Sequence, residues 1–152
     1  MWQYVALAAG CAVAAWVLMM LLFRFSGRIP TDLGVRDGRL AACPQKPNCV
    51  CTFDADPQHR IEPLRFAGDP AEAMARLKTV LAGLPRVRVV AETGTYLHAE
   101  FRSLLFRFVD DVEFLIDDAA KVIHFRSASR AGHSDLGVNR RRMEAIRRAL
   151  AG

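Results

Sequence analysis

The sequence predicts an α+β protein: an N-terminal transmembrane helix followed by a two-layer domain, in which a five-stranded antiparallel sheet carries two helices on one face. Three observations support this prediction. The chain begins with a long uncharged run, its middle alternates apolar and polar residues between short turns, and two segments repeat apolar residues at helical spacing. The predicted order of elements is β-α-β-β-β-β-α, in a domain of residues 61–152.

Residues 1–25 are predicted to form a membrane anchor. From Trp2 to Phe23 no residue is charged, and as a helix this run would be about 33 Å long, enough to cross a hydrocarbon core of about 30 Å. A cleaved signal peptide is the alternative. However, no basic segment precedes the run, and the run is longer than the apolar core of such peptides. An uncleaved single-pass anchor is therefore the favoured interpretation.

Residues 26–60 are predicted to be a tether, because they are rich in Pro, Gly and Asp and show no helical or strand period. A connection this long is expected to lie partly against the domain. It contains Cys43, Cys49 and Cys51. A disulfide from Cys43 to either of the other two is the favoured interpretation. Zinc is the alternative, but the spacing lacks a C-x2–4-C pair and no pair of histidines follows.

The first strand and the first helix of the domain come next. Residues 61–66 alternate as a strand, which Pro63 confines to an edge of the sheet because proline has no N–H to donate. The helix that follows is expected to have Asp69 as its N-cap, Pro70 in its first turn and Gly83 at its end. Its apolar residues belong to the core.

Four strands and a second helix complete the domain. The strands are expected at residues 87–91, 95–102, 107–116 and 121–127, with short turns between them, so that neighbours pair antiparallel. The second helix carries Met143, Ile146 and Leu150 at helical spacing.

Alternation divides the last strands into an apolar and a polar face. If the turn at residues 117–120 is tight, residues whose numbers sum to 237 lie opposite each other. Glu113 then faces His124, Asp111 faces Arg126, and Asp110 faces Ser127. The strand at residues 95–102 can add His98, Glu100 and Arg102 to the polar face.

This polar face has two interpretations. His98, Glu100, Asp111, Glu113 and His124 could hold Zn or Mn if their strands are adjacent. An exposed ladder of ion pairs is favoured instead, because neighbouring arginines would repel a cation. We therefore expect no metal and no cofactor.

The segment from Arg126 to Arg142 is the most informative stretch. With Asn139 as N-cap of the second helix, three arginines fall in the first turn, where the helix dipole disfavours cations by about 0.3–1 kcal/mol each. In the alternative, Asp135 is the cap and Leu136 joins the apolar stripe. Other interactions must offset this cost to the arginines. Ion pairs with carboxylates inside the fold are the favoured interpretation, and an external anion at the Ser/Gly loop is the alternative.

These residues form the candidate site. The candidate ligand-binding residues are Arg126, Ser127, Ser129, Arg130, Ser134, Asn139, Arg140 and Arg141. The carboxylates expected to organise them are Asp110, Asp111 and Glu113. No catalytic residue is assigned. A hydrolase could be assembled from Ser134, His133 or His124, and Asp110, but the G-x-S-x-G elbow is missing.

The net charge does not by itself indicate a nucleic-acid binder, and no nucleic-acid partner is expected. The chain carries +5, and Arg24 and Arg28 supply two of these charges, which leaves only a mild excess in the domain. A membrane-anchored, non-enzymatic binding module is therefore favoured, with anionic lipid or an envelope protein as partner. An envelope hydrolase and a purely structural domain are the alternatives.

Several motifs resemble those of the domain-of-unknown-function 1499 family. They are residues 33–49, 101–103, 106–114, 126–130 and 134–140. The resemblance covers about residues 33–150 and implies one shared pattern, which consists of Cys43, Cys49, Asp110, Asp111, Glu113, Arg126, Ser127, Ser129, Arg130, Asp135, Asn139 and Arg140. It implies no activity, since none is established for the family. The chain departs from the pattern at Cys51, where serine is more usual, so the partner of Cys43 stays open.

The side of the membrane is contested by two signals. Arg24 and Arg28 follow the apolar run and no basic residue precedes it, which favours a cytoplasmic domain, where the cysteines would be free thiols. The cysteine loop, together with resembling plastid members that look lumenal, favours the periplasm. We expect a single-pass protein of the inner membrane with a periplasmic domain.

Overall fold

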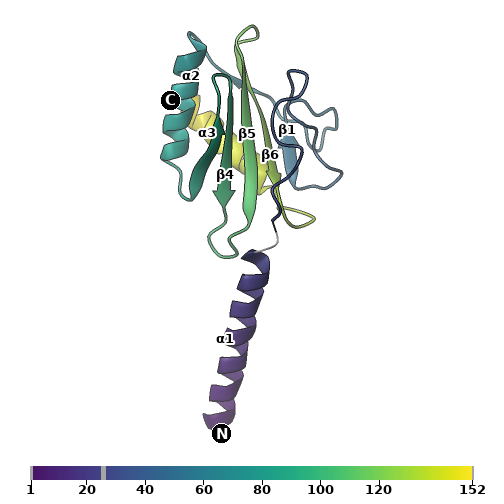
Figure 1. Cartoon of the computed structure of the whole chain (residues 1–152), viewed down its shortest axis with the longest axis vertical. Coiled ribbons are helices and arrows are strands. Elements are labelled where there is room, and N and C mark those ends of the chain that lie inside the picture. Colours follow the sequence, from purple (N-terminus) through teal and green to yellow (C-terminus); the bar gives the residue numbers. More distant parts are fainter. Residues whose placement is uncertain (1, 25–26, 152) are drawn as a thin grey trace.

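The computed structural model describes residues 2–24 and 27–151 of the chain. Figure 1 shows an N-terminal helix that projects from one end of an α+β domain. In chain order the elements are α1 (Trp2–Arg24), β1 (Cys49–Cys51), β2 (Leu64–Arg65), α2 (Pro70–Ala82), β3 (Val87–Glu92), β4 (Tyr96–Arg102), β5 (Val109–Asp117), β6 (Val122–Ser129) and α3 (Val138–Ala151).

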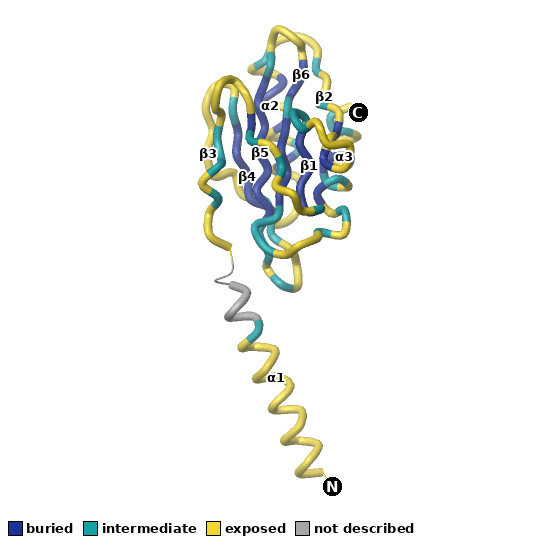
Figure 2. The backbone as a smooth tube through the Cα atoms, turned by 90° about the vertical axis from the view of Figure 1, so that its right-hand side faces the viewer, coloured by how far each residue is buried: buried dark blue, intermediate teal, exposed yellow. Residues whose placement is uncertain are grey.

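Helix α1 stands apart from the domain. It includes the whole uncharged run, and its side chains at residues 2–18 are exposed (Figure 2). In the described part of the chain it is the one helix long and apolar enough to cross a membrane, with a mean hydropathy of 1.6 over Trp2–Met19. The predicted boundary between anchor and tether, at residues 25 and 26, lies outside the described residues.

The sheet is antiparallel throughout, and the predicted α+β class is confirmed. Its strands lie in the order β1-β6-β5-β4-β3, and β2 also pairs with β6. Strand β1 comes from the predicted tether and was not expected, because three residues are too few to show a period. Strand β2 has two residues instead of the predicted six.

Helices α2 and α3 cover one face of this sheet, as expected, and the core lies between these helices and the strands. Asp69 caps α2, since its carboxylate accepts hydrogen bonds from the N–H groups of Ala71 and Glu72. The central strands are buried along most of their length (Figure 2). The most buried core side chains are Leu77, Leu81, Leu97, Ala99, Val112, Phe114, Ile123, Phe125, Met143 and Ile146.

The register of β5 on β6 differs from the predicted one by two residues. Asp117 pairs with Val122, so the loop spans residues 118–121 and Lys121 takes a left-handed φ of 53°. Glu113 therefore faces Arg126 instead of His124. Because a shift of two keeps every side chain on its face, the predicted apolar and polar faces are unchanged.

That shift also corrects the other two predicted pairs. Asp111 faces Ala128 instead of Arg126, and Asp110 faces Ser129 instead of Ser127.

The start of α3 fits neither sequence interpretation. Asn139 lies inside the helix and is fully buried, so it is not the N-cap. Leu136 is 83% exposed and therefore does not join the apolar stripe. The carboxylate of Asp135 accepts hydrogen bonds from the N–H groups of Gly137 and Asn139, and Leu136 and Gly137 both have positive φ. The helix thus begins after a left-handed turn that Asp135 holds in place.

Candidate functional site

The polar face of the sheet is buried, because the segment of residues 27–48 lies over it. In Figure 1 this segment runs in front of the sheet on the side of β6 and β1, while α3 lies behind the sheet. Glu113 is 0% exposed and Asp111 1% exposed. Ion pairs do form on this face, but with other partners than predicted, Glu113 with Arg126 and Asp111 with Arg130, and the predicted exposure is wrong. The physical reason is that the tether folds back on the strands instead of extending into solvent.

Arg130 is the centre of one half of this buried charge network. Its guanidinium donates to both carboxylate oxygens of Asp111, at 2.7 Å each, and to Glu100, also at 2.7 Å. His98 Nε2 lies 2.8 Å from Asp111 Oδ1. Burial opposes the ionisation of Asp111, but the hydrogen bonds from Arg130 and His98 outweigh it and lower its pKa.

Glu100 shows the same balance. Burial favours its neutral form, yet hydrogen bonds from Arg130, Arg102 and Arg88 lower its pKa. The bonds to Asp111 and Glu100 in turn raise the pKa of Arg130. Asp111, Glu100 and Arg130 are therefore ionised together at neutral pH.

Arg126 is the centre of the other half. It donates to Glu113 at 3.4 Å and to Asp32 of the overlying segment at 2.9 Å. Glu113 also accepts from the hydroxyl of Tyr96, at 2.8 Å, and from the N–H of Gly34, at 2.6 Å. Burial, and then the charge of Glu113, raise the pKa of Tyr96. The overlying segment is thus fixed to the sheet by charged and polar contacts.

A second polar cluster lies on the helix-covered side, where α3 begins. The amide of Asn139 accepts from Ser127 Oγ at 2.6 Å and from Arg142, and it donates to Ser129 Oγ and to the carbonyl of Asn48, at 3.0 Å each. These bonds join α3, β6 and the cysteine loop. A signal for them was present in the sequence, because Ser127 and Ser129 continue an otherwise apolar face next to a helix start.

The three consecutive arginines near the start of α3 have separate partners. Arg142 pairs with Asp110 and lies over the ring of Phe101, 4.6 Å from its centroid. Arg140 donates to two backbone carbonyls, those of Gln58 and Arg60, at 3.0 Å each. Arg141 is exposed and donates to the carbonyl of Leu136 at 2.8 Å. Among the described residues, Arg141 forms no salt bridge, so its charge faces solvent.

The predicted ligand-binding residues therefore divide into two groups. Arg126, Ser127 and Asn139 are buried and bonded within the fold, and the side chain of Arg130 is almost as inaccessible, at 6% exposed. Ser129, half-buried, bonds Asn139. The members that reach solvent are Ser134, Arg141 and, in part, Arg140.

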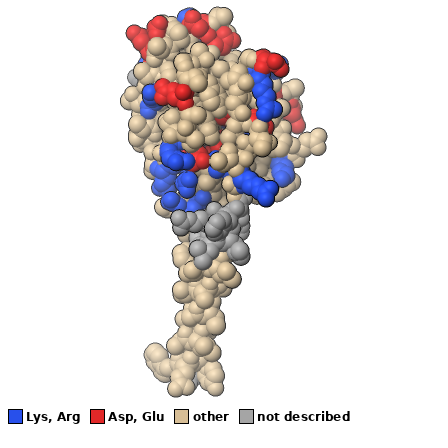
Figure 3. All heavy atoms as spheres, viewed as in Figure 1, with Lys and Arg blue, Asp and Glu red and all other residues tan. Residues whose placement is uncertain are grey.

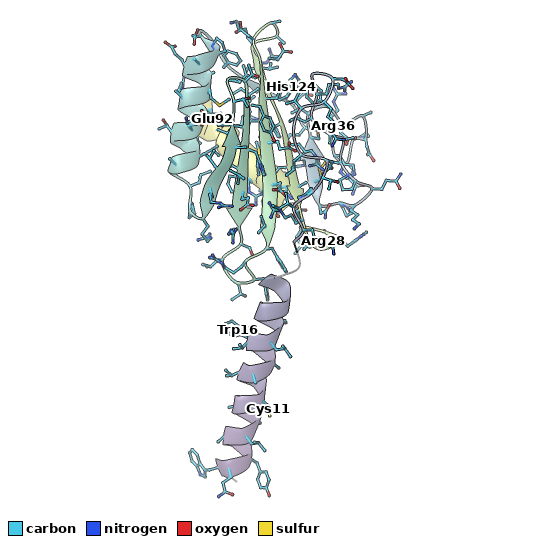
Figure 4. All side chains as sticks on the ribbon, viewed as in Figure 1. Cys11, Trp16, Arg28, Arg36, Glu92 and His124 are labelled. Carbon is cyan, nitrogen blue, oxygen red and sulfur yellow. A yellow bond between two sulfur atoms is a disulfide. The ribbon has the colours of Figure 1, made fainter. Side chains whose placement is uncertain are left out.

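The loop of residues 130–141, which here includes the first turn of α3 and carries Ser134 and Arg141, begins where the chain enters the domain from α1. A Cβ placed on Gly27 would lie 3.2 Å from Cδ of Arg130, so these residues are in contact. In Figure 4, Arg28 lies at this same end, whereas His124 and Glu92 lie toward the other end.

The cysteine loop contains a disulfide between Cys43 and Cys49, whose Cα atoms are 5.6 Å apart. Cys51 is a free, buried thiol in β1, and burial raises its pKa. The disulfide closes the loop that presents Asn48, whose carbonyl accepts from both Asn139 and the N–H of Ser129.

The residues considered for a metal site do not come together, and neither do His124 and Asp110, which were considered for a hydrolase. In the described part of the chain, no three His, Cys, Asp or Glu residues lie close enough to hold a metal ion. His124 is stacked on Phe53, with ring centroids 4.0 Å apart, and partial burial lowers its pKa. It faces Leu115, five positions and so about 16 Å along β5 from Asp110, which excludes a triad of His124 with Asp110.

Known proteins add a family to this description but no activity. A comparison with curated proteins finds no match to the chain. Residues 39–150 match the family described as "Protein of unknown function (DUF1499)", and since this range covers most of the chain, the protein belongs to that family.

Proposed function

We propose that this protein is a membrane-anchored, non-catalytic module that binds a phosphate-bearing lipid headgroup at its loop of residues 130–141. In this proposal α1 is a single-pass anchor in an inner membrane. The observation that carries the proposal is the contact between Gly27 and Arg130, since it sets this loop beside the point where the chain enters the domain from α1.

Anchoring is supported by the exposure of α1. No residue of Trp2–Met19 is buried against the rest of the chain, although the segment is strongly apolar. An apolar surface of this size on a monomer indicates an interaction site, and a bilayer would cover it along its whole length.

Headgroup binding is supported by Arg141. Its guanidinium is exposed in the first turn of α3, where the helix dipole disfavours a cation, and a phosphate at that position would offset the cost. The buried bonds of Arg130 and Asn139 fix the two ends of the loop, so that it needs little ordering on binding. In this proposal Ser134, Arg140 and Arg141 face the ligand, while Arg126, Ser127, Ser129, Arg130 and Asn139 support them.

A non-catalytic role is supported by the state of the titratable groups. The buried carboxylates and arginines of the polar face are bonded to one another, with Asp111 and Glu100 held ionised by Arg130. A general acid or base works best with a pKa near the operating pH, and the lowered pKa values of Asp111 and Glu100 lie on the far side of their ordinary values from it.

Vesicle binding tests the proposal. Residues 27–152 are suitable for this, because they contain the described core residues, and no residue of Trp2–Met19 is buried. We expect the domain to cosediment with vesicles rich in phosphatidylglycerol, and Arg141→Ala to bind about fivefold more weakly, since an arginine near an anionic surface contributes about 1 kcal/mol. Arg148→Ala, exposed in the last turn of α3, is the matched control and is expected to bind as the unchanged domain does.

Three results would contradict the proposal. The first is equal binding by the Arg141 and Arg148 variants, and the second is no binding by the unchanged domain. The third is hydrolysis of an ester or phosphoester by the domain that is lost on Ser134→Ala, which would support an envelope hydrolase instead.

A further inference from the structure

The domain exposes leucines in two separate loops. Leu104 and Leu105, in the loop between β4 and β5, are 73% and 59% exposed, and Leu136, in the loop before α3, is 83% exposed. A single exposed leucine needs no explanation. Several at one end of a molecule form an apolar surface that indicates an interaction site.

Strand register places both loops at the same end of the sheet. Asp110 pairs with Ser129, and the N–H of Arg130 donates to the carbonyl of Val109 at 3.0 Å, so the start of β5 lies beside the end of β6. The contact of Gly27 with Arg130 adds the entry point of the chain to this end. The leucine loops and the end of α1 therefore lie together (Figure 1). We call this end of the domain the proximal face.

The charge of the domain is divided between its two ends. Exposed arginines accompany the proximal leucines: Arg107 lies in the same loop, and Arg86 donates to the carbonyl of Arg102 where β3 and β4 meet that loop. The opposite end carries Asp117, the last residue of β5, and Asp118 in the β5–β6 turn, where Lys121 pairs with Asp118. Figure 3 shows basic groups gathered next to α1 and acidic groups at the far end.

The loop of residues 103–108 is held in shape by its own contacts. The N–H of Ser103 donates to the carbonyl of Phe108, and the N–H of Phe108 donates to Ser103 Oγ, each at 2.9 Å. The rings of Phe106 and Phe108 stack with centroids 5.5 Å apart. The two leucines are thus presented to solvent on a closed loop, which lowers the entropy cost of placing them in a partner.

We propose that the proximal face inserts into the interface of the bilayer that holds α1. Leu104, Leu105 and Leu136 enter the boundary between headgroups and acyl chains, while Arg28 and Arg107 bind lipid phosphates from the rim. This follows because a bilayer crossed by α1 already lies opposite this face, and leucines flanked by arginines match such an interface. The inference rests on the proposed anchoring and adds a second, peripheral membrane contact to it.

Site-directed spin labelling of the full chain in bilayers containing phosphatidylglycerol tests the inference. In a Cys11→Ser background, single labels are attached at Leu105→Cys and Leu136→Cys, both exposed, while Cys51 is buried. Ala119→Cys, exposed in the β5–β6 turn, is the aqueous control, and Val13→Cys reports on α1. We expect the labels at 105 and 136 to collide several-fold more with dissolved oxygen, relative to a water-soluble nickel chelate, than the label at 119.

The outcomes separate the two proposals. If the labels at 105 and 136 meet the nickel chelate as freely as the label at 119, while the label at 13 is shielded, the proximal face does not insert and anchoring stands. Its surface would then serve a protein partner. If the label at 13 is itself accessible to the chelate, anchoring fails and the inference fails with it.

Discussion

At the scale of the residue, the polar face depends on how each arginine is matched to carboxylates. Arg130 forms a bidentate pair with Asp111 and a further bond to Glu100, and all three side chains are almost fully buried. Such a pair adds little over an apolar one, but removing one partner leaves charge uncompensated in the interior. Removing one partner of such an ion pair is therefore expected to cost more stability than the intact pair contributes.

We predict that Arg130→Ala destabilises the protein by about 3–5 kcal/mol, because Asp111 and Glu100 lose their shared buried cation. Urea unfolding of the full chain in detergent, followed by circular dichroism, measures this. Arg88→Ala is the matched control: it also removes a bond to Glu100, but its side chain is 66% exposed, and we expect a loss below about 1 kcal/mol. Equal losses in the two variants would show that burial does not govern these pairs.

A pH dependence follows from the same contacts. The folded protein holds the pKa values of Asp111 and Glu100 below their ordinary values of 3.8 and 4.5, so unfolding takes up protons in acid. The stability they contribute is complete above the ordinary values and is lost as the pH falls through the lowered ones. We therefore predict that the free energy of unfolding falls steeply below about pH 4. Arg130→Ala should show a shallower fall, and an unchanged slope would contradict this assignment.

At the scale of the element, the segment of residues 27–60 has the largest structural role that the sequence did not reveal. It contributes β1, covers the polar face and supplies Asn48 to the start of α3. Strands β3 to β6 and helix α2 could be predicted because their apolar periods and caps are local. The register of β5 on β6 could not, since the left-handed Lys121 that lengthens the turn has no signature in its residue type.

The cysteine loop gives a prediction at this scale. Replacing both Cys43 and Cys49 by serine is expected to cost about 2 kcal/mol, because the disulfide closes a short loop of sequence separation 6. Hydrogen exchange at the Ser129 amide should rise, since that N–H donates to the carbonyl of Asn48 in the loop. Cys51→Ser keeps the disulfide and is the control. If Cys51→Ser loses as much stability as the double variant, the burial of residue 51 holds the cysteine loop in place, and the disulfide does not.

At the scale of the whole molecule, the candidate site was only partly predictable from its residues. The Ser/Arg segment was correctly predicted to lie beside its carboxylates, because both lie at the ends of adjacent strands. The sequence did not show that Arg126, Ser127 and Asn139 would be buried, since Arg126 and Asn139 bond to Asp32 and Asn48, which lie 94 and 91 residues earlier in the chain. It also did not mark the leucines of the proximal face, which are unremarkable until the register places the two loops together.

The side of the membrane is the remaining property of the whole molecule, and we predict a periplasmic domain. Arg24 and Arg28 favour the cytoplasm through a statistical bias in basic residues, whereas a disulfide such as Cys43–Cys49 does not persist in a reducing compartment. The disulfide is a stronger indication of the compartment than the distribution of basic residues. We expect a membrane-impermeant maleimide to label Cys11→Ser/Ala119→Cys in intact cells, with the label on a membrane-bound chain of full length.

The Cys11→Ser chain without the added cysteine is the control for this labelling. It should stay unlabelled, because Cys51 is buried and burial raises the pKa of its thiol, which keeps it in the unreactive form. Labelling only after lysis would place the domain in the cytoplasm, where Cys43 and Cys49 should then also react. A labelled, soluble chain that lacks α1 would instead identify the first helix as a cleaved signal sequence, and the proposed anchoring and insertion of the proximal face would both fail.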